Sequence, residues 1–348
     1  MTTIDQTALD AFMGQFVTDF GAAMHAATVV IGDKLGLYKT LAEHGPITAK
    51  DLATRTRLDP RLVEEWCGAQ GVSGYASLDP ASGTWALSPE QAAVLADEST
   101  PAFLAGAMWL VAAMFKDEEK IRTAFETGRG LGWHEHDHDL FHGTERLFKP
   151  GYLGNLVAAW IPALDGVHER LQAGASIADL GCGHGASTIL LAQAYPESTI
   201  VGFDYHAESI DVARKRAAEA GVADRVRFEV ASAEDFPGTG YDLVCIFDAL
   251  HDMGDPAAAA SHIRAALAED GTWLLVEPMT PVEGPVGRVF LSASVGICTP
   301  GAQAQAGAFA LGNQVTDERW AELIAASGFT RFRRATETPL NRIFEVRR

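Results

Sequence analysis

The sequence is short of positive charge. It holds 27 lysines and arginines against 46 aspartates and glutamates, so the formal net charge at neutral pH is −19. Tight binding to nucleic acid or to an anionic membrane requires a basic surface. The charge balance therefore argues against both kinds of partner.

Long apolar runs and closely spaced cysteines are also missing. No stretch approaches the roughly 18 uninterrupted apolar residues of a membrane-spanning helix. The opening, MTTIDQTALDAF, lacks the basic and apolar regions of a secretory signal peptide. The cysteines lie far apart, without the paired spacing of a zinc site, at Cys67, Cys182, Cys245 and Cys298. We expect a cytoplasmic protein with reduced thiols.

Residues 1–98 are predicted to form a winged-helix domain. Three helical stretches are followed by two short alternating strands around the turn DPASG, and then by a further helix. In a repressor the third helix would read DNA, but here it carries Arg61 against Glu64 and Glu65. Because a basic reading face is missing, we expect this domain to serve dimerisation.

Two apolar helices motivate the dimer. The helices expected at 9–32 and 101–115 carry more hydrophobic surface than one subunit needs. Exposed apolar surface of this extent is typical of protein interfaces. We therefore predict a homodimer.

Residues 99–172 are predicted to form a helical connector and a substrate lid. The segment GRGLGWHEHDHDLFHG interrupts its helices and holds four of the eleven histidines, His134, His136, His138 and His142. Alternating histidines on an extended strand would suit a metal ion. The segment is polar and flanked by glycine, which is typical of a solvated surface loop. We assign it no metal and expect a lid over the acceptor, with Trp133 and Phe141 facing inward.

Residues 173–348 are predicted to form a doubly wound parallel α/β sheet. Strands are expected near 176–180, 199–203, 226–230, 241–247 and 272–277, with helices between them. After the helical stretch TDERWAELIAASGF, two β-like segments follow near 330–336 and 342–347. They lie close enough to pair as an antiparallel hairpin at the end of the sheet.

A glycine-rich loop follows the first of these strands. In IADLGCGHGAST, Asp179, Gly181, Gly183 and Gly185 stand at the junction of strand and helix. Glycines there allow backbone amides to approach a ligand, and a helix N-terminus favours a negative group. With Ala186 the loop also satisfies the dinucleotide pattern loosely. The loop alone fits a nicotinamide dehydrogenase as well.

The order acid-x-G-x-G-x-G resembles class I S-adenosylmethionine (SAM) methyltransferases. Asp204 in VGFDYH is placed to accept hydrogen bonds from both ribose hydroxyls, although a dehydrogenase would carry an acid there too. In ASAEDFP the resemblance implies that the Ala233 backbone meets an adenine ring nitrogen and that Glu234 accepts from the exocyclic amine. The predicted cofactor-binding residues are Asp179, Gly181, Gly183, Gly185, Asp204, Tyr205, Ala233, Glu234 and Phe247.

The whole chain is similar to the small-molecule O-methyltransferases of plants and of bacterial natural-product pathways. That family joins a winged-helix domain and a helical connector to a Rossmann-like seven-stranded SAM-methyltransferase sheet, and carries an L-H-D-W phrase after the fourth strand. Here the phrase reads LHDMGDP, and the next strand ends in LLVEP. The resemblance implies that His251 is the general base and that Glu277 orients it, with Asp252 beside them as a third catalytic residue.

The chemistry of methyl transfer explains this pair. A hydroxyl acceptor must lose its proton before or during attack on a sulfonium, and a histidine accepts a proton near neutral pH. A carboxylate behind the imidazole fixes its tautomer and stabilises the imidazolium. Two residues depart from the family: Met253 replaces the aromatic, and Gln314 falls where a second glutamate is found. Alternatively, His251 is a capping residue after the strand.

We predict a SAM-dependent methyltransferase acting on a small, partly apolar or aromatic molecule that bears a hydroxyl group. A nitrogen or carbon methyltransferase would use the same cofactor site and need little help from a base. A winged-helix regulator that senses SAM is the alternative that is not an enzyme.

Overall fold

The structure is a computed structural model that describes residues 4–348, so residues 1–3 of the predicted domain 1–98 lie outside the described residues. The chain divides into two compact units. Unit 1 comprises the N-terminal part through Phe115 together with 138–150, and unit 2 comprises 116–137 and 151–348. The predicted boundaries at 98 and 172 stay predictions.

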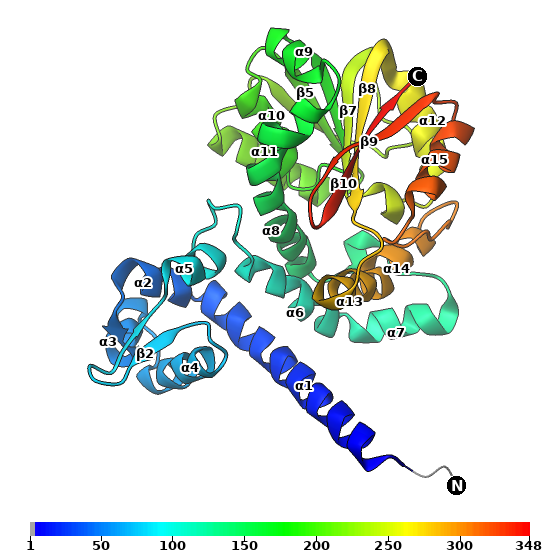
Figure 1. The fold of residues 1–348 in the computed structure, drawn as a ribbon. Coiled ribbons are helices and arrows are strands. Elements are labelled where there is room, and N and C mark those ends of the chain that lie inside the picture. The colour runs from blue at the N-terminus through cyan, green and yellow to red at the C-terminus, as the bar shows by residue number, and fades with distance from the viewer. Residues whose placement is uncertain (1–3) are drawn as a thin grey trace. The chain divides into compact units, whose positions relative to one another are not determined.

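Unit 1 contains the predicted winged-helix order (Figure 1). Its elements are α1 (Gln6–Lys34), α2 (Leu37–His44), β1 (Ile47–Thr48), α3 (Ala49–Thr56), α4 (Pro60–Val72), β2 (Ser77–Asp79), β3 (Thr84–Ala86) and α5 (Pro89–Leu95). The short strands form an antiparallel sheet in the order β1-β3-β2. Hydroxyl and carboxylate caps start the helices: Thr48 accepts from the Asp51 amide, Asp59 from the Leu62 amide and Ser88 from the Gln91 amide.

The α4 helix offers no basic reading face. The guanidinium of Arg61 pairs with the carboxylates of both Glu64 and Glu65 on the exposed side of the helix. The opposite side buries Val63 and Trp66 in the core of unit 1. The exposed side of α4 is therefore neutral to acidic, as the sequence indicates.

The histidine-rich segment is more ordered than a surface loop. A 3₁₀ turn η2 (Trp133–Glu135) is followed by helix α8 (His138–Asn155), so His138 and His142 lie one helical turn apart rather than on an extended strand. His136 is buried, with its Nδ1 at 3.0 Å from Asp117 Oδ2 in unit 2. Asp139 supplies the acid that helix N-termini favour and accepts from Lys34 Nζ at 2.8 Å.

The remaining helical elements before the large sheet are η1 (Ala105–Ala107), α6 (Met108–Lys116), α7 (Glu118–Thr127), η3 (Leu156–Trp160), η4 (Ile161–Ala163) and α9 (Val167–Ala173). Within residues 4–348, no helix has the length and apolar character needed to cross a membrane.

Unit 2 contains a seven-stranded sheet in the order β6-β5-β4-β7-β8-β10-β9. Its strands are β4 (Ser176–Leu180), β5 (Thr199–Asp204), β6 (Val226–Val230), β7 (Tyr241–Phe247), β8 (Leu267–Pro278), β9 (Arg331–Glu337) and β10 (Asn341–Arg347). The first five run parallel, and β10 pairs antiparallel with both β8 and β9. The predicted fold class, a Rossmann-like methyltransferase sheet, is confirmed.

Helices cover both faces of this sheet (Figure 1). The covering helices that follow β4 are α10 (Ala186–Ala194), α11 (Ala207–Glu219), α12 (Pro256–Ala266) and α15 (Asp317–Ala326). The 3₁₀ turn η5 (Leu250–Asp252) follows β7, and α13 (Gly284–Ala293), η6 (Ser294–Cys298) and α14 (Thr299–Gln303) lie beyond the end of the sheet. Apolar residues of α9, α10 and α11 share one buried cluster with the sheet, and those of α12 and α15 share another. The central strands are therefore buried on both faces, which explains their nearly continuous apolar runs.

A buried arginine of β10 ties three segments together. Arg342 is fully buried; its Nε donates to Pro278 O at 2.9 Å and its Nη2 to Val315 O at 2.8 Å. Its Nη1 donates to Asp317 Oδ1 at 2.5 Å. The guanidinium thus fixes the end of β8 against the chain that enters α15.

Substitution Arg342→Met should lower the free energy of unfolding of the full chain by about 3–5 kcal/mol, because it leaves buried acceptors unpaired. Arg334→Met is the matched control: Arg334 binds the other oxygen of Asp317 from the surface, and a surface pair contributes about 0–1 kcal/mol. Unfolding of both variants in guanidinium chloride measures the difference in their free energies of unfolding. Equal destabilisation by the two variants would contradict the role of the buried clamp.

Candidate functional site

The parallel register brings the ends of the central strands to one edge. Leu180 pairs with Phe203 on β5 and with Ile246 on β7, and Phe247 pairs with Val276 on β8. The residues that follow each strand therefore lie at this carboxyl edge of unit 2, where ligands of open α/β sheets bind.

The glycine loop at this edge needs its glycines. Gly181, Gly183 and Gly185 all adopt the left-handed conformation, with φ of 69°, 51° and 80°. A Cβ on Gly185 would lie 2.8 Å from the ring of Phe228, so a side chain there has no room. The loop is exposed at Gly181 and partly exposed at Gly183, whereas Gly185 is buried at the start of α10.

The carboxylate of Asp179 links the end of β4 to the first turn of α10. Its Oδ2 accepts hydrogen bonds from the hydroxyls of Ser187 at 2.7 Å and Thr188 at 2.6 Å. Its Oδ1 is buried and has no hydrogen-bond partner among the described residues. Burial, opposed by the two hydroxyls and reinforced by Asp204, raises the pKa of Asp179 to about 6. A ligand donor at Oδ1 would complete its shell.

Asp204 joins the end of β5 to the glycine loop. Its Oδ2 accepts from the Gly183 amide and its Oδ1 from the His206 amide, both at 2.9 Å. Each carboxylate oxygen has a further lone pair for a ligand hydroxyl. Burial raises the pKa of Asp204. The neighbouring Tyr205 is 44% exposed, so its ring borders the site rather than the core.

The other predicted cofactor residues lie at the ends of β6 and β7. Ala233 and Glu234 stand in a turn that Asp235 closes by accepting from the Ser232 amide at 3.0 Å. Partial burial and then the carboxylates of Asp255 and Asp235 raise the pKa of Glu234. Phe247 is buried at the end of β7, where its ring stacks near Trp160 and Tyr152.

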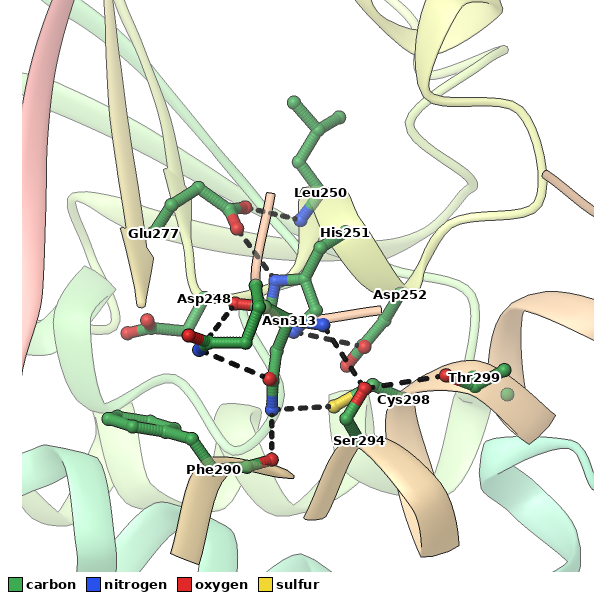
Figure 2. A network of polar contacts seen from close by, with 12 residues as sticks. Asp248, Leu250, His251, Asp252, Glu277, Phe290, Ser294, Cys298, Thr299 and Asn313 are labelled. Carbon is green, nitrogen blue, oxygen red and sulfur yellow. Dashed lines mark hydrogen bonds and ion pairs between the residues drawn. The ribbon is translucent and has the colours of Figure 1, made fainter. Parts of the chain in front are cut away.

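The predicted catalytic pair forms a buried contact (Figure 2). His251 lies in the 3₁₀ turn η5 after β7, and Glu277 lies next to the last residue of β8. The His251 Nδ1 is 2.7 Å from Glu277 Oε2, and the Leu250 amide donates to Glu277 Oε1 at 3.2 Å. His251 and Glu277 are 3% and 1% exposed, so the pair is shielded from water. The imidazole can rotate little in this setting.

A second carboxylate stands on the other side of the imidazole. Asp252 Oδ1 lies 3.1 Å from His251 Nε2. Burial alone would lower the pKa of His251, but Asp252 and Glu277 outweigh it and raise this pKa well above the usual value. The arrangement therefore stabilises the imidazolium strongly.

Three polar neighbours of this pair are absent from the sequence prediction (Figure 2). Asp248 accepts from Asn341 Nδ2 at 2.7 Å, and burial followed by the charge of Glu277 raises its pKa well above the usual value. Asn313 Nδ2 donates to Phe290 O at 2.7 Å and lies 3.6 Å from Cys298 Sγ. Asp248 stands inside the FDALHD phrase and could have been found there. Cys298 and Asn313 lie far along the chain, and no local pattern marks them.

The two departures from the family pattern are also located. Gln314 donates through Nε2 to Met279 O at 3.3 Å, so it contacts the chain just beyond Glu277 without supplying charge. Met253 is partly buried against the apolar cluster beneath α12. Among the described residues, neither forms a hydrogen bond with His251.

Two stretches of the chain match known protein families. Residues 171–297 match a family described as "Methyltransferase domain", and residues 23–97 match the "Rv2258c-like winged HTH domain". The uncharacterized methyltransferase YcgJ of Bacillus subtilis is 32% identical over 118 residues, which are 33% of this chain and 45% of that protein. The chain spans less than half of the length of the first curated relatives it matches.

Solved structures share the fold over nearly the whole chain. Human N-acetylserotonin methyltransferase in complex with SAM has a TM-score of 0.73 at 17% identity and covers 100% of this chain and 99% of that one. Mitomycin 7-O-methyltransferase has a TM-score of 0.69 at 20% identity, with coverages of 98% and 99%. At these identities the likeness establishes the fold alone. The match of residues 171–297 confirms that the chain contains the predicted methyltransferase domain, and the neighbour solved with SAM supports SAM as its cofactor.

The raised pKa of Asp179 makes stability depend on pH. An unfolded aspartate has a pKa of about 3.9, and the folded value is about 6, so the folded chain holds more protons between these values. Its free energy of unfolding should therefore fall as pH rises through this window, by up to about 3 kcal/mol relative to Asp179→Asn. Denaturation curves at pH 4 to 7 measure this difference. The exposed Asp224→Asn is the control, and a pH-independent gap between wild type and Asp179→Asn would contradict the prediction.

Proposed function

Because the chain combines a methyltransferase domain with an N-terminal winged helix-turn-helix domain, we propose that it transfers a methyl group from SAM to a hydroxyl group of a small apolar or aromatic molecule. The observation that carries the choice of oxygen is the buried contact of His251 with Glu277 at 2.7 Å. A hydroxyl needs a base, and this imidazole is held as one.

The carboxyl edge fits the cofactor. SAM carries an ammonium group, and the buried Asp179 Oδ1 and Asp248 Oδ2 are acceptors without a hydrogen-bond partner among the described residues. The glycine loop leaves room for a ligand against the backbone. In this proposal Asp204 and Tyr205 bind the ribose end, Ala233 and Glu234 the adenine, and Phe247 packs beneath the methionine portion. When bound, SAM supplies an electrophilic methyl group on a sulfonium.

The chain's own residues then handle the proton. In its neutral form His251 accepts the proton of the acceptor hydroxyl at Nε2, beside Asp252 Oδ1, while its Nδ1–H stays bonded to Glu277 Oε2. Because the two carboxylates raise the pKa of His251, this neutral form becomes more populated as pH rises. The Leu250 amide holds the second oxygen of Glu277, so the carboxylate cannot turn away. Asp252 and Glu277 flank the imidazolium that results. General-base help of this kind contributes on the order of 10² to 10⁴ in rate.

The alternatives receive less support from the site. An amine is already nucleophilic, so a nitrogen methyltransferase has little use for a buried imidazole between two carboxylates. A SAM-sensing regulator would need a basic DNA-reading helix, whereas Arg61 of α4 is paired with Glu64 and Glu65.

Substitution His251→Gln should lower the rate of methyl transfer by on the order of 10² to 10⁴ while leaving SAM affinity within a few-fold, because only the base is removed. Glu277→Gln should lower it less, since the imidazole stays but loses its charged partner. Transfer from labelled SAM to a panel of hydroxylated aromatic compounds measures both.

His262→Gln is the matched control. His262 lies on α12 in the same unit, contacts Phe236 O through Nε2 at 2.8 Å, and has no place in the proposed site. Near-normal turnover by His251→Gln with intact SAM binding would refute the base and favour an amine or carbon acceptor.

The surface of α1 supports a homodimer. Phe12, Phe16, Phe20 and Met24 recur every four residues along one side of the helix, each between 59% and 65% exposed. A stripe of this kind on two identical helices is self-complementary, as a twofold interface requires. A second copy of the chain is therefore the proposed occupant.

Phe16→Glu combined with Phe20→Glu should convert the dimer to a monomer at micromolar concentration, because a charge would be buried unpaired at the interface. Thr18→Glu adds charge on the opposite side of the same exposed helix and should leave the dimer intact. Light scattering after size-exclusion chromatography measures the mass. A wild-type monomer, or equal behaviour of the two sets of variants, would refute this interface.

A further inference from the structure

A thiol stands beside the predicted base. One ring nitrogen of His251, a carboxylate oxygen of Asp252 and the sulfur of Cys298 lie within 4.8 Å of one another. Because Glu277 holds Nδ1, the nitrogen that faces this group is Nε2, 3.1 Å from Asp252 Oδ1. Cys298 itself is buried, at the end of the π-helical turn η6. Single π turns inside helices are frequent at functional sites.

The surroundings of these three residues resemble the outer shell of a metal site. Histidine ligands almost always donate their second ring N–H to a carboxylate, a backbone carbonyl or water, and the Nδ1 of His251 has Glu277 as such a partner. The Cys298 sulfur has an amide donor, Asn313 Nδ2, at 3.6 Å. Asn313 is in turn fixed by Phe290 O. Both the nitrogen and the sulfur are therefore oriented before any ion arrives.

We propose that His251, Asp252 and Cys298 form an inhibitory binding site for a thiophilic divalent cation of the zinc class. One imidazole, one thiolate and one carboxylate are ligands that Zn²⁺ accepts in tetrahedral sites, with the fourth position left for water. Mg²⁺ and Ca²⁺ prefer oxygen ligands and are disfavoured by the nitrogen and the sulfur. The Cys298 thiol gives up its proton to solvent when the metal–sulfur bond forms, and no redox change takes place.

The metal ion would inhibit methyl transfer because it binds the same ring nitrogen that accepts the proton. The lone pair of His251 Nε2 is the one that accepts the acceptor's proton, so a metal–nitrogen bond and base catalysis exclude one another. This consequence rests on the proposed function, whereas metal binding does not. The carboxylate of Glu277 on the other ring nitrogen offsets part of the charge of the ion.

Surface histidines can also bind metal ions, so the experiment needs a signal that only a site with a cysteine ligand gives. His134 and His138 lie in a different segment and would bind metal ions weakly without sulfur. Co²⁺ distinguishes the two cases, because a cysteine ligand adds a thiolate-to-cobalt charge-transfer band to the visible d–d bands of a tetrahedral site. The experiment uses the full-length chain without a histidine tag, stripped of metal by a chelator.

Titration with Co²⁺ should produce the charge-transfer band at one equivalent, and Zn²⁺ should abolish it by displacement. Cys298→Ser should remove the band, and Asp252→Asn should weaken Co²⁺ binding at least tenfold. Cys245→Ser is the matched control: Cys245 is equally buried, in the middle of β7, and the band should persist. A band that survives in Cys298→Ser, or no band in the wild type, would overturn the site.

Methyl-transfer assays with added Zn²⁺ separate this proposal from the proposed function. Zn²⁺ should inhibit the wild-type chain at concentrations that saturate the Co²⁺ site, and Cys298→Ser should need at least tenfold more. Binding of cobalt without inhibition by zinc would overturn the inhibitory role. A chain that binds cobalt as expected yet shows normal turnover in His251→Gln would instead refute the general base and leave the metal site standing.

Discussion

The parallel pairing of β7 with β8 is the constraint on which the site depends. Phe247 lies opposite Val276, so the turn after β7 and the last residues of β8 must meet at one edge. His251 and Glu277 come from these two places, 26 residues apart in the chain, and reach hydrogen-bond distance without a special loop. A shift of one residue in this register would turn Glu277 to the other face of the sheet. The base is therefore a consequence of strand pairing.

That edge concentrates negative charge in a poorly solvated place. Asp179, Asp204, Asp248 and Glu277 all follow or end central strands, and Asp179 and Asp248 each keep one buried oxygen without a hydrogen-bond partner among residues 4–348. Buried carboxylates destabilise a fold unless they are paired. The arrangement is costly for an empty scaffold and favourable for a cationic ligand. A cofactor with an ammonium and a sulfonium group would offset this cost on binding.

The sequence predicts the large sheet well for a physical reason. Each central strand is buried on both faces, so it appears as a short apolar run between glycine, proline or acidic residues. The cofactor loop and the pair of His251 with Glu277 follow from these strands because their residues directly adjoin them. The histidine-rich segment is different, because its glycines and histidines favour a loop prediction although helix α8 begins at His138. The first turn of α8 contains an acidic residue and is followed by buried apolar residues. The glycine and histidine content of this segment predicts a loop, whereas the spacing of its buried apolar residues fits the helix.

The positions of Cys298 and Asn313 near His251 could not be predicted from the sequence. They reach the surroundings of His251 through η6 and the segment before α15, whose positions depend on tertiary contacts such as the bond from Asn313 to Phe290 O. Their proximity to His251 also explains why a rigidly oriented imidazole can bind a metal ion. An imidazole with one carboxylate on Nδ1 and a second 3.1 Å from Nε2 can bind either a proton or Zn²⁺ at Nε2. The carboxylate of Asp252 beside Nε2 suits either cation, whereas the thiol of Cys298 within 4.8 Å adds a ligand that only the metal ion can use.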